Sequence, residues 1–170
     1  MTKKVNTATL LVVLLSASFA NAQATGAKHS AVGVWKLDLT QSTFPSAPPV
    51  KSVTLTILED TPDAMAWRWE GVDATGKSNV YSWSGPTDGS MQDLKDGDGQ
   101  PVAKESVKRE GDLLLRHGEI ANVQTMDGRG TFSADGTTFT LVDTTKTQDG
   151  KTSTTTTVFH RVAGAQQASK

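Results

Sequence analysis

Apolar and polar side chains alternate along most of the chain after residue 30, which is the period of a strand with one buried face. In the segment 31–40 the residues on the apolar face are Trp35, Leu37 and Leu39. No run of helical period has a convincing length, and the abundant threonine, valine and tryptophan favour extended backbone. The pattern therefore predicts an all-β domain.

Turn signals separate the predicted strands at intervals of roughly 8 to 12 residues, a spacing typical of a sandwich or an up-and-down barrel. Prolines in the segment 41–50 exclude both ladder hydrogen bonds and a helix there, and the glycine- and aspartate-rich segment 85–99 is predicted to be a loop. We expect about 8 to 10 short antiparallel strands. The segments concerned are 31–40, 52–58, 65–71, 77–83, 102–109, 113–117, 120–125, 129–133, 137–144 and 151–162.

A hairpin is predicted at residues 73–77, where Gly76 suits the left-handed position of a three-residue loop. Asp73 would then face Lys77, which fixes the register of the two strands. Counting back from that pair gathers four aromatic residues on one face, with Trp69 opposite Tyr81 and Trp67 opposite Trp83. Such pairs stabilise a sheet by roughly 0.2 to 1 kcal/mol each, so the four residues are explained either by sheet packing or by a ligand site.

The first residues have the layout of a secretory signal peptide, with Lys3 and Lys4 before an uncharged apolar run at 10–15. The sequence Ala20-Asn21-Ala22 predicts cleavage after Ala22, with Ala24 as the alternative. We therefore expect a cleaved segment 1–22, a flexible mature N-terminus 23–30, one domain at 31–163 and a disordered tail 164–170. The protein would be periplasmic or secreted, without a transmembrane segment in the mature chain, and the absence of cysteine leaves its stability to a packed core.

Charge and motifs predict no nucleic-acid partner, metal, cofactor or catalytic residue. The formal net charge is −1 without a basic stripe, and none of the three histidines (His29, His117 and His160) forms a close pair of metal ligands. The segment 96–99 with Glu105 matches part of a calcium loop, but a leucine takes its first position and we interpret it as a solvated turn. There is no G-x-S-x-G motif, and a carboxylate pair such as Glu70 with Glu119 leaves enzymatic activity open.

The sequence Gly33-Val34-Trp35-Lys36-Leu37 resembles the first strand of calycin barrels, the superfamily of lipocalins and fatty-acid-binding proteins. Together with the turns at 133–136 and 148–151, it is similar to a group of small secreted bacterial lipocalin-like proteins of largely unknown function. The resemblance implies a calycin barrel plugged at one end by Trp35, with Arg161 stacked on that ring. Two family features have no counterpart here: a helical lid after the first strand, and a carboxylate-binding R-x-Y, which Thr157 and Phe159 replace.

Two functions of different kinds follow from this fold. The first is a small hydrophobic molecule bound inside the barrel, and the expected ligand-binding residues are Trp35, Trp67, Trp69, Tyr81 and Trp83. The alternative is a non-catalytic envelope interaction module with a filled barrel, which would bind a protein or polysaccharide through its loops. The sequence leaves the ligand and the oligomeric state open.

Overall fold

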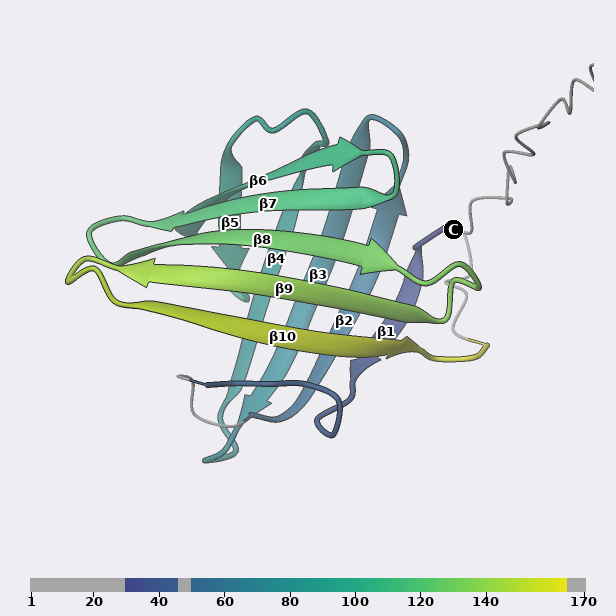
Figure 1. Cartoon of the computed structure of the whole chain (residues 1–170), viewed down its shortest axis with the longest axis horizontal. Helices are drawn as coiled ribbons and strands as arrows, with labels where there is room; N and C mark the ends of the chain where they lie inside the picture. Colours follow the sequence, from purple (N-terminus) through teal and green to yellow (C-terminus); the bar gives the residue numbers. More distant parts are fainter. Residues whose placement is uncertain (1–29, 46–49, 165–170) are drawn as a thin grey trace, which may run out of the picture.

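The computed structural model describes residues 30–45 and 50–164, and within them the chain forms strands and turns without a helix. The strands are β1 (Gly33–Leu37), β2 (Val50–Asp60), β3 (Ala64–Asp73), β4 (Ser78–Pro86), β5 (Gln92–Asp96), β6 (Pro101–Glu110), β7 (Leu113–Ile120), β8 (Gln124–Phe132), β9 (Thr138–Thr147) and β10 (Thr152–Arg161). Each strand pairs with the next along the chain, and β1 also pairs with β10, which closes the sheet into a barrel (Figure 1). The predicted all-β antiparallel up-and-down barrel is confirmed.

The predicted hairpin and its register are also confirmed. The backbone N–H of Asp73 donates to the carbonyl of Lys77 at 3.0 Å, and Gly76 has a φ of 95°. Across β3 and β4, Trp69 lies opposite Tyr81 and Trp67 lies opposite Trp83.

Three predicted boundaries were wrong, each for a local reason. The segment 85–99 was predicted to be a loop, but it contains the short strand β5, in which exposed and partly buried residues alternate. This strand was not predicted because glycine and aspartate residues typical of turns surround it. The predicted strand 120–125 is interrupted by the β7–β8 turn at 121–123, where Asn122 takes a φ of 57°, so its two ends belong to different strands. The first strand ends at Leu37 because the Asp38 carboxylate accepts the backbone N–H of Thr40, and Leu39 is left 43% exposed.

One end of the barrel interior is filled by aromatic side chains around Trp35, which has no solvent exposure. Its ring centroid lies 5.5 Å from that of Phe132 and 6.2 Å from that of Phe139. The guanidinium of Arg161 lies 4.5 Å from the Trp35 ring centroid, so the stacking that the resemblance implied is present. We call Trp35, Phe132, Phe139, Phe159 and Arg161 the Trp35 cluster.

The predicted signal peptide and residues 23–29 lie outside the described residues, as do residues 165–170 of the predicted tail. The structure therefore leaves cleavage and export as expectations. Among the residues that it does describe, none belongs to a helix long and apolar enough to cross a membrane.

Candidate functional site

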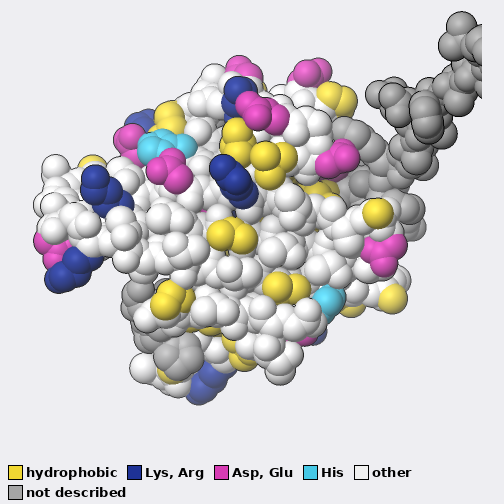
Figure 2. Space-filling view, in the orientation of Figure 1, with side chains coloured by type: hydrophobic (Ala, Val, Ile, Leu, Met, Phe, Trp, Pro, Cys, Tyr) yellow, Lys and Arg dark blue, Asp and Glu magenta, His cyan; other side chains and the backbone are white. Residues whose placement is uncertain are grey.

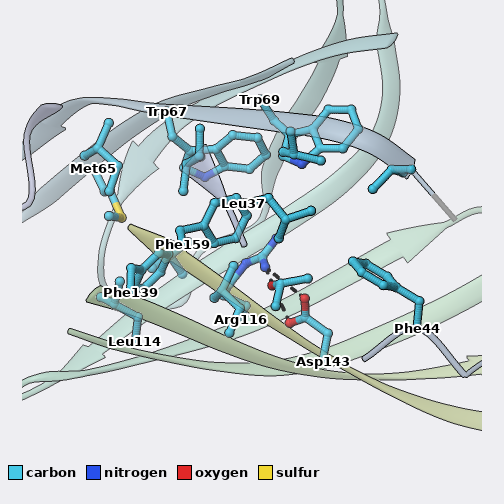
Figure 3. Close-up of a pocket in the computed structure, with 17 residues that line it drawn as sticks. Leu37, Phe44, Met65, Trp67, Trp69, Leu114, Arg116, Phe139, Asp143 and Phe159 are labelled. Carbon is cyan, nitrogen blue, oxygen red and sulfur yellow. Dashed lines mark hydrogen bonds and ion pairs between the residues drawn. The ribbon is translucent and has the colours of Figure 1, made fainter. Parts of the chain in front are cut away.

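A cavity of about 220 Å³ lies inside the barrel, walled by β1, β2, β3, β6, β7, β9 and β10 together with Phe44 (Figure 3). Most of its wall is apolar, and the polar side chains that reach it are Arg116, Asp143 and Thr157. Phe139 and Phe159 belong both to this wall and to the Trp35 cluster. The filled end of the barrel therefore forms one boundary of the cavity.

A second cavity, of about 240 Å³, adjoins the first and shares Trp67, Trp69 and Arg116 with it. Tyr81 lines only the second cavity. Neither cavity alone reaches the roughly 300 Å³ at which small-molecule sites usually begin, but the two together do. We treat them as two compartments of one interior site.

The four tryptophans divide into two pairs by their indole hydrogen bonds. The indole N–H of Trp35 donates to the Ala31 carbonyl, and that of Trp83 donates to the Glu105 carbonyl, each at 2.9 Å. Neither of these rings lines a cavity. By contrast, Trp67 and Trp69 line both cavities, and their indole N–H groups donate to no group in the described part of the chain.

The predicted site residues thus occupy different places. Trp67, Trp69 and Tyr81 border the interior space, and Trp69 packs on Tyr81 with ring centroids 5.5 Å apart. Trp35 and Trp83 are buried at 0% and 2% exposure as packed core. Trp67, Trp69 and Tyr81 can therefore contact a ligand in the cavities directly, whereas Trp35 and Trp83 do not line either cavity.

A charged cluster that the sequence analysis missed lies between the two cavities. Arg116 Nε donates to Glu105 Oε1 at 2.8 Å, and Arg116 Nη1 lies 3.3 Å from Asp143 Oδ2. The three side chains are only 16%, 3% and 19% exposed, in the order Arg116, Glu105, Asp143. Burial lowers the pKa of Arg116, but the two carboxylates outweigh it and raise that pKa above its ordinary value, so the guanidinium stays charged.

Glycine makes room for this cluster. In the register of β7, β8 and β9, Gly128 lies opposite both Arg116 and Asp143. A Cβ atom added at Gly128 would lie 2.0 Å from Asp143 Oδ1. The missing side chain therefore lets the Asp143 carboxylate lie across β8 towards Arg116, as the dashed lines in Figure 3 show.

The sequence does contain a signal for this cluster, because a charged residue at an inward position of an alternating strand is uncommon. Arg116 is two residues from the buried Leu114, and Glu105 is two residues from the buried Val107. Because every second side chain of a strand points to the same face, this spacing places both side chains inside the barrel once the strands are known. It does not show that the two lie beside each other and beside Asp143, which depends on the register of four strands.

The calcium-loop residues do not form one site. Asp96 Oδ1 accepts the backbone N–H groups of Asp98 and Gln100 in the β5–β6 turn, whereas Glu105 points into the barrel. The two histidines among the described residues have separate partners, since His117 contacts Asp127 and His160 contacts Asp38, while His29 lies outside the described residues. Across the described ranges, no group of three or more histidine or acidic side chains is arranged to hold a metal ion.

The suggested carboxylate pair is not formed either. Glu70 forms an ion pair with Arg68, and Glu119 forms one with His117. On the outer face in Figure 2, hydrophobic side chains appear mostly as small separate groups among polar and charged ones.

Comparison with solved structures supports the fold. The zebrafish ileal bile acid-binding protein, solved with cholic acid, superposes with a TM-score of 0.51 at 16% identity, covering 78% of this chain and 100% of that one. The fluorescent protein UnaG superposes with a TM-score of 0.50 at 19% identity, covering 77% and 96%. At this identity the likeness shows the fold alone, a closed antiparallel barrel. No protein-family model and no curated protein sequence matches the chain.

Proposed function

We propose that this protein is an exported, lipocalin-like binding protein that holds a small hydrophobic molecule inside its barrel. The observation that carries the proposal is the pair of adjoining interior cavities, of which the first has a mostly apolar wall and both are bordered by Trp67 and Trp69. Most small-molecule sites combine such a wall with a few polar groups that fix orientation. Here those polar groups are the indole N–H groups of Trp67 and Trp69 and the charged cluster of Arg116, Glu105 and Asp143.

The zebrafish bile acid-binding protein supports this proposal by example, because a protein of similar barrel fold forms a complex with the small molecule cholic acid. The layout of residues 1–22 supports export to the periplasm or beyond. Binding would bury apolar ligand surface at roughly 25 cal/mol per Å², offset by the cost of immobilising the ligand. We therefore expect micromolar affinity.

The test is a fluorescence titration with long-chain alcohols, fatty acids, retinoid-like molecules and aromatic compounds. Binding should shift the tryptophan emission, and the double variant Trp67→Phe/Trp69→Phe should lose most of that shift because Trp35 and Trp83 lie outside the cavities. An unchanged emission with the whole panel would contradict the proposal.

A matched pair of variants tests whether the ligand enters the barrel. Leu141 lines the first cavity, whereas its neighbour Val142 faces outward and is 39% exposed. By calorimetry, Leu141→Trp should weaken binding at least tenfold by filling the cavity, and Val142→Trp should leave it unchanged. Equal effects of the two variants would place the ligand outside the barrel.

A further inference from the structure

The charged cluster between the cavities contains one cation and two anions. Glu105 and Asp143 are both buried within hydrogen-bond or ion-pair distance of Arg116, so the formal charges of this cluster sum to one net negative charge. Charges interact more strongly in such an environment than in water. The affinity for a ligand will therefore depend on the charge of the polar group that it brings to this cluster.

The other charged residues that line the second cavity do not offset this excess. Lys104 is 61% exposed and forms an ion pair with Asp93, and Glu119 is 55% exposed and forms one with His117. Both are screened by water at the rim. Charged groups this exposed contribute much less to the electrostatic potential inside the barrel than the three buried groups do.

The hydrogen bonds of the cluster leave one carboxylate oxygen available. Glu105 is 2% exposed overall and lines the second cavity. Its Oε1 accepts from Arg116, whereas its Oε2 accepts no hydrogen bond from any residue in the ranges 30–45 and 50–164. A ligand donor that reached this oxygen would supply a bond that the protein itself lacks.

We propose that the site selects hydrophobic molecules that end in a cationic or hydrogen-bond-donating group, such as an amine, over those that end in a carboxylate. The assignment rests on the proposed ligand-binding function and names the chemical class of the ligand. An ammonium group beside Glu105 and Asp143 balances the two carboxylates against two cations. A carboxylate head would instead gather three anions around one guanidinium, which is costly out of water.

The apolar part of such a ligand would lie in the first cavity. Asp143 and Arg116 are the charged residues in its wall, and both belong to the cluster at one side. A chain in that cavity places its head between the two compartments, close to Trp67, whose ring centroid lies 6.0 Å from the Arg116 guanidinium carbon. An aromatic face beside the head also favours a cation.

The test compares three probes that share one apolar chain: decylamine, 1-decanol and decanoate, each below its micelle concentration at pH 7. We expect decylamine to bind at least tenfold more tightly than decanoate, with 1-decanol between them. Equal affinities, or tighter binding of decanoate, would overturn the charge selection while leaving the binding function intact. Failure of all three to bind would overturn the binding function, and the selection with it.

Two charge-neutralising variants locate the effect. Asp143→Asn and Glu105→Gln should each reduce the preference for decylamine over decanoate by about tenfold, while 1-decanol binding reports that the variant is folded and its cavity intact. The control is Asp127→Asn on the outer face, where the carboxylate is 76% exposed, and it should leave the preference unchanged. A preference that survives both interior variants would overturn the assignment.

Discussion

The Trp35 cluster fills one end of the barrel with side chains, whereas the region around Trp67 and Trp69 contains two cavities. Both regions are built from inward-facing tryptophans on paired strands. They differ in what surrounds each ring: Trp35 contacts phenylalanines, an arginine and a carbonyl acceptor, while Trp67 and Trp69 border open space. The comparison teaches that an inward aromatic residue marks the barrel interior, and that its neighbours decide whether it is core or binding surface.

The largest expected effect separates the two regions by stability. Trp35→Ala removes a fully buried ring and its hydrogen bond, so we expect the free energy of unfolding to fall by about 3 to 5 kcal/mol. Urea denaturation followed by circular dichroism measures this loss. A cost below about 1 kcal/mol would mean that the Trp35 cluster is not the main packed core.

A glycine substitution tests the connection between the cavities and the charged cluster. Gly128→Ala forces the Asp143 carboxylate away from Arg116, and we expect a loss of about 1 to 3 kcal/mol in urea denaturation. Gly118→Ala is the matched control, because its Cβ would meet a flexible methionine end at 3.3 Å. It should cost less than about 1 kcal/mol, and equal losses would argue against a specific role for Gly128.

In the region around Trp67 and Trp69, we expect a substitution to affect ligand affinity more than stability. Trp69→Leu should lower stability by only about 1 kcal/mol, mostly through the lost packing on Tyr81, while ligand affinity falls about tenfold. Denaturation and calorimetry on the same sample separate the two quantities. A stability loss as large as that of Trp35→Ala would show that the two regions are equally packed.

The smallest effect concerns the outer surface, away from both regions. Asp127 and Glu119 hydrogen-bond to His117 and raise its pKa. A raised pKa in the folded state stabilises the protein below the ordinary value of about 6.5, and this contribution is lost as the pH rises through the raised value. Because His117 is 38% exposed, we expect only a few tenths of a kcal/mol.

The urea midpoint at pH 5.5 and at pH 8.5 measures this term, with His117→Gln as the variant that lacks it. The wild-type protein should lose slightly more stability over that range than the variant. An equal change in both proteins would assign the pH dependence to other groups.

Local sequence chemistry predicted much of this fold. Gly76 fixed one hairpin, and with it the register that brings Trp67 and Trp69 to the same face as Tyr81. The short strand β5 escaped because five residues carry too little periodicity among turn residues. A strong local pattern, such as the Gly76 hairpin, was enough to predict the local structure. Where the pattern was short, as in β5, the structure depends on pairing with neighbouring strands.

The candidate site was predicted only in part, for a different reason. The alternation of side chains along its own strand predicted that Trp67 points into the barrel. The grouping of Arg116 with Glu105 and Asp143 instead depends on the pairing of β6, β7, β8 and β9. The division of the tryptophans into core and cavity wall likewise depends on side chains distant in sequence. No local pattern contains that information.

The most direct test of the binding site is a ¹H–¹⁵N correlation spectrum of the four indole N–H groups during titration with 1-decanol. The signals of Trp67 and Trp69 should shift with saturation at micromolar concentration, because these groups border the cavities, while those of Trp35 and Trp83 stay nearly fixed in their carbonyl hydrogen bonds. Four unchanged signals, or larger shifts at Trp35 and Trp83, would contradict a ligand site between the indoles of the hollow region.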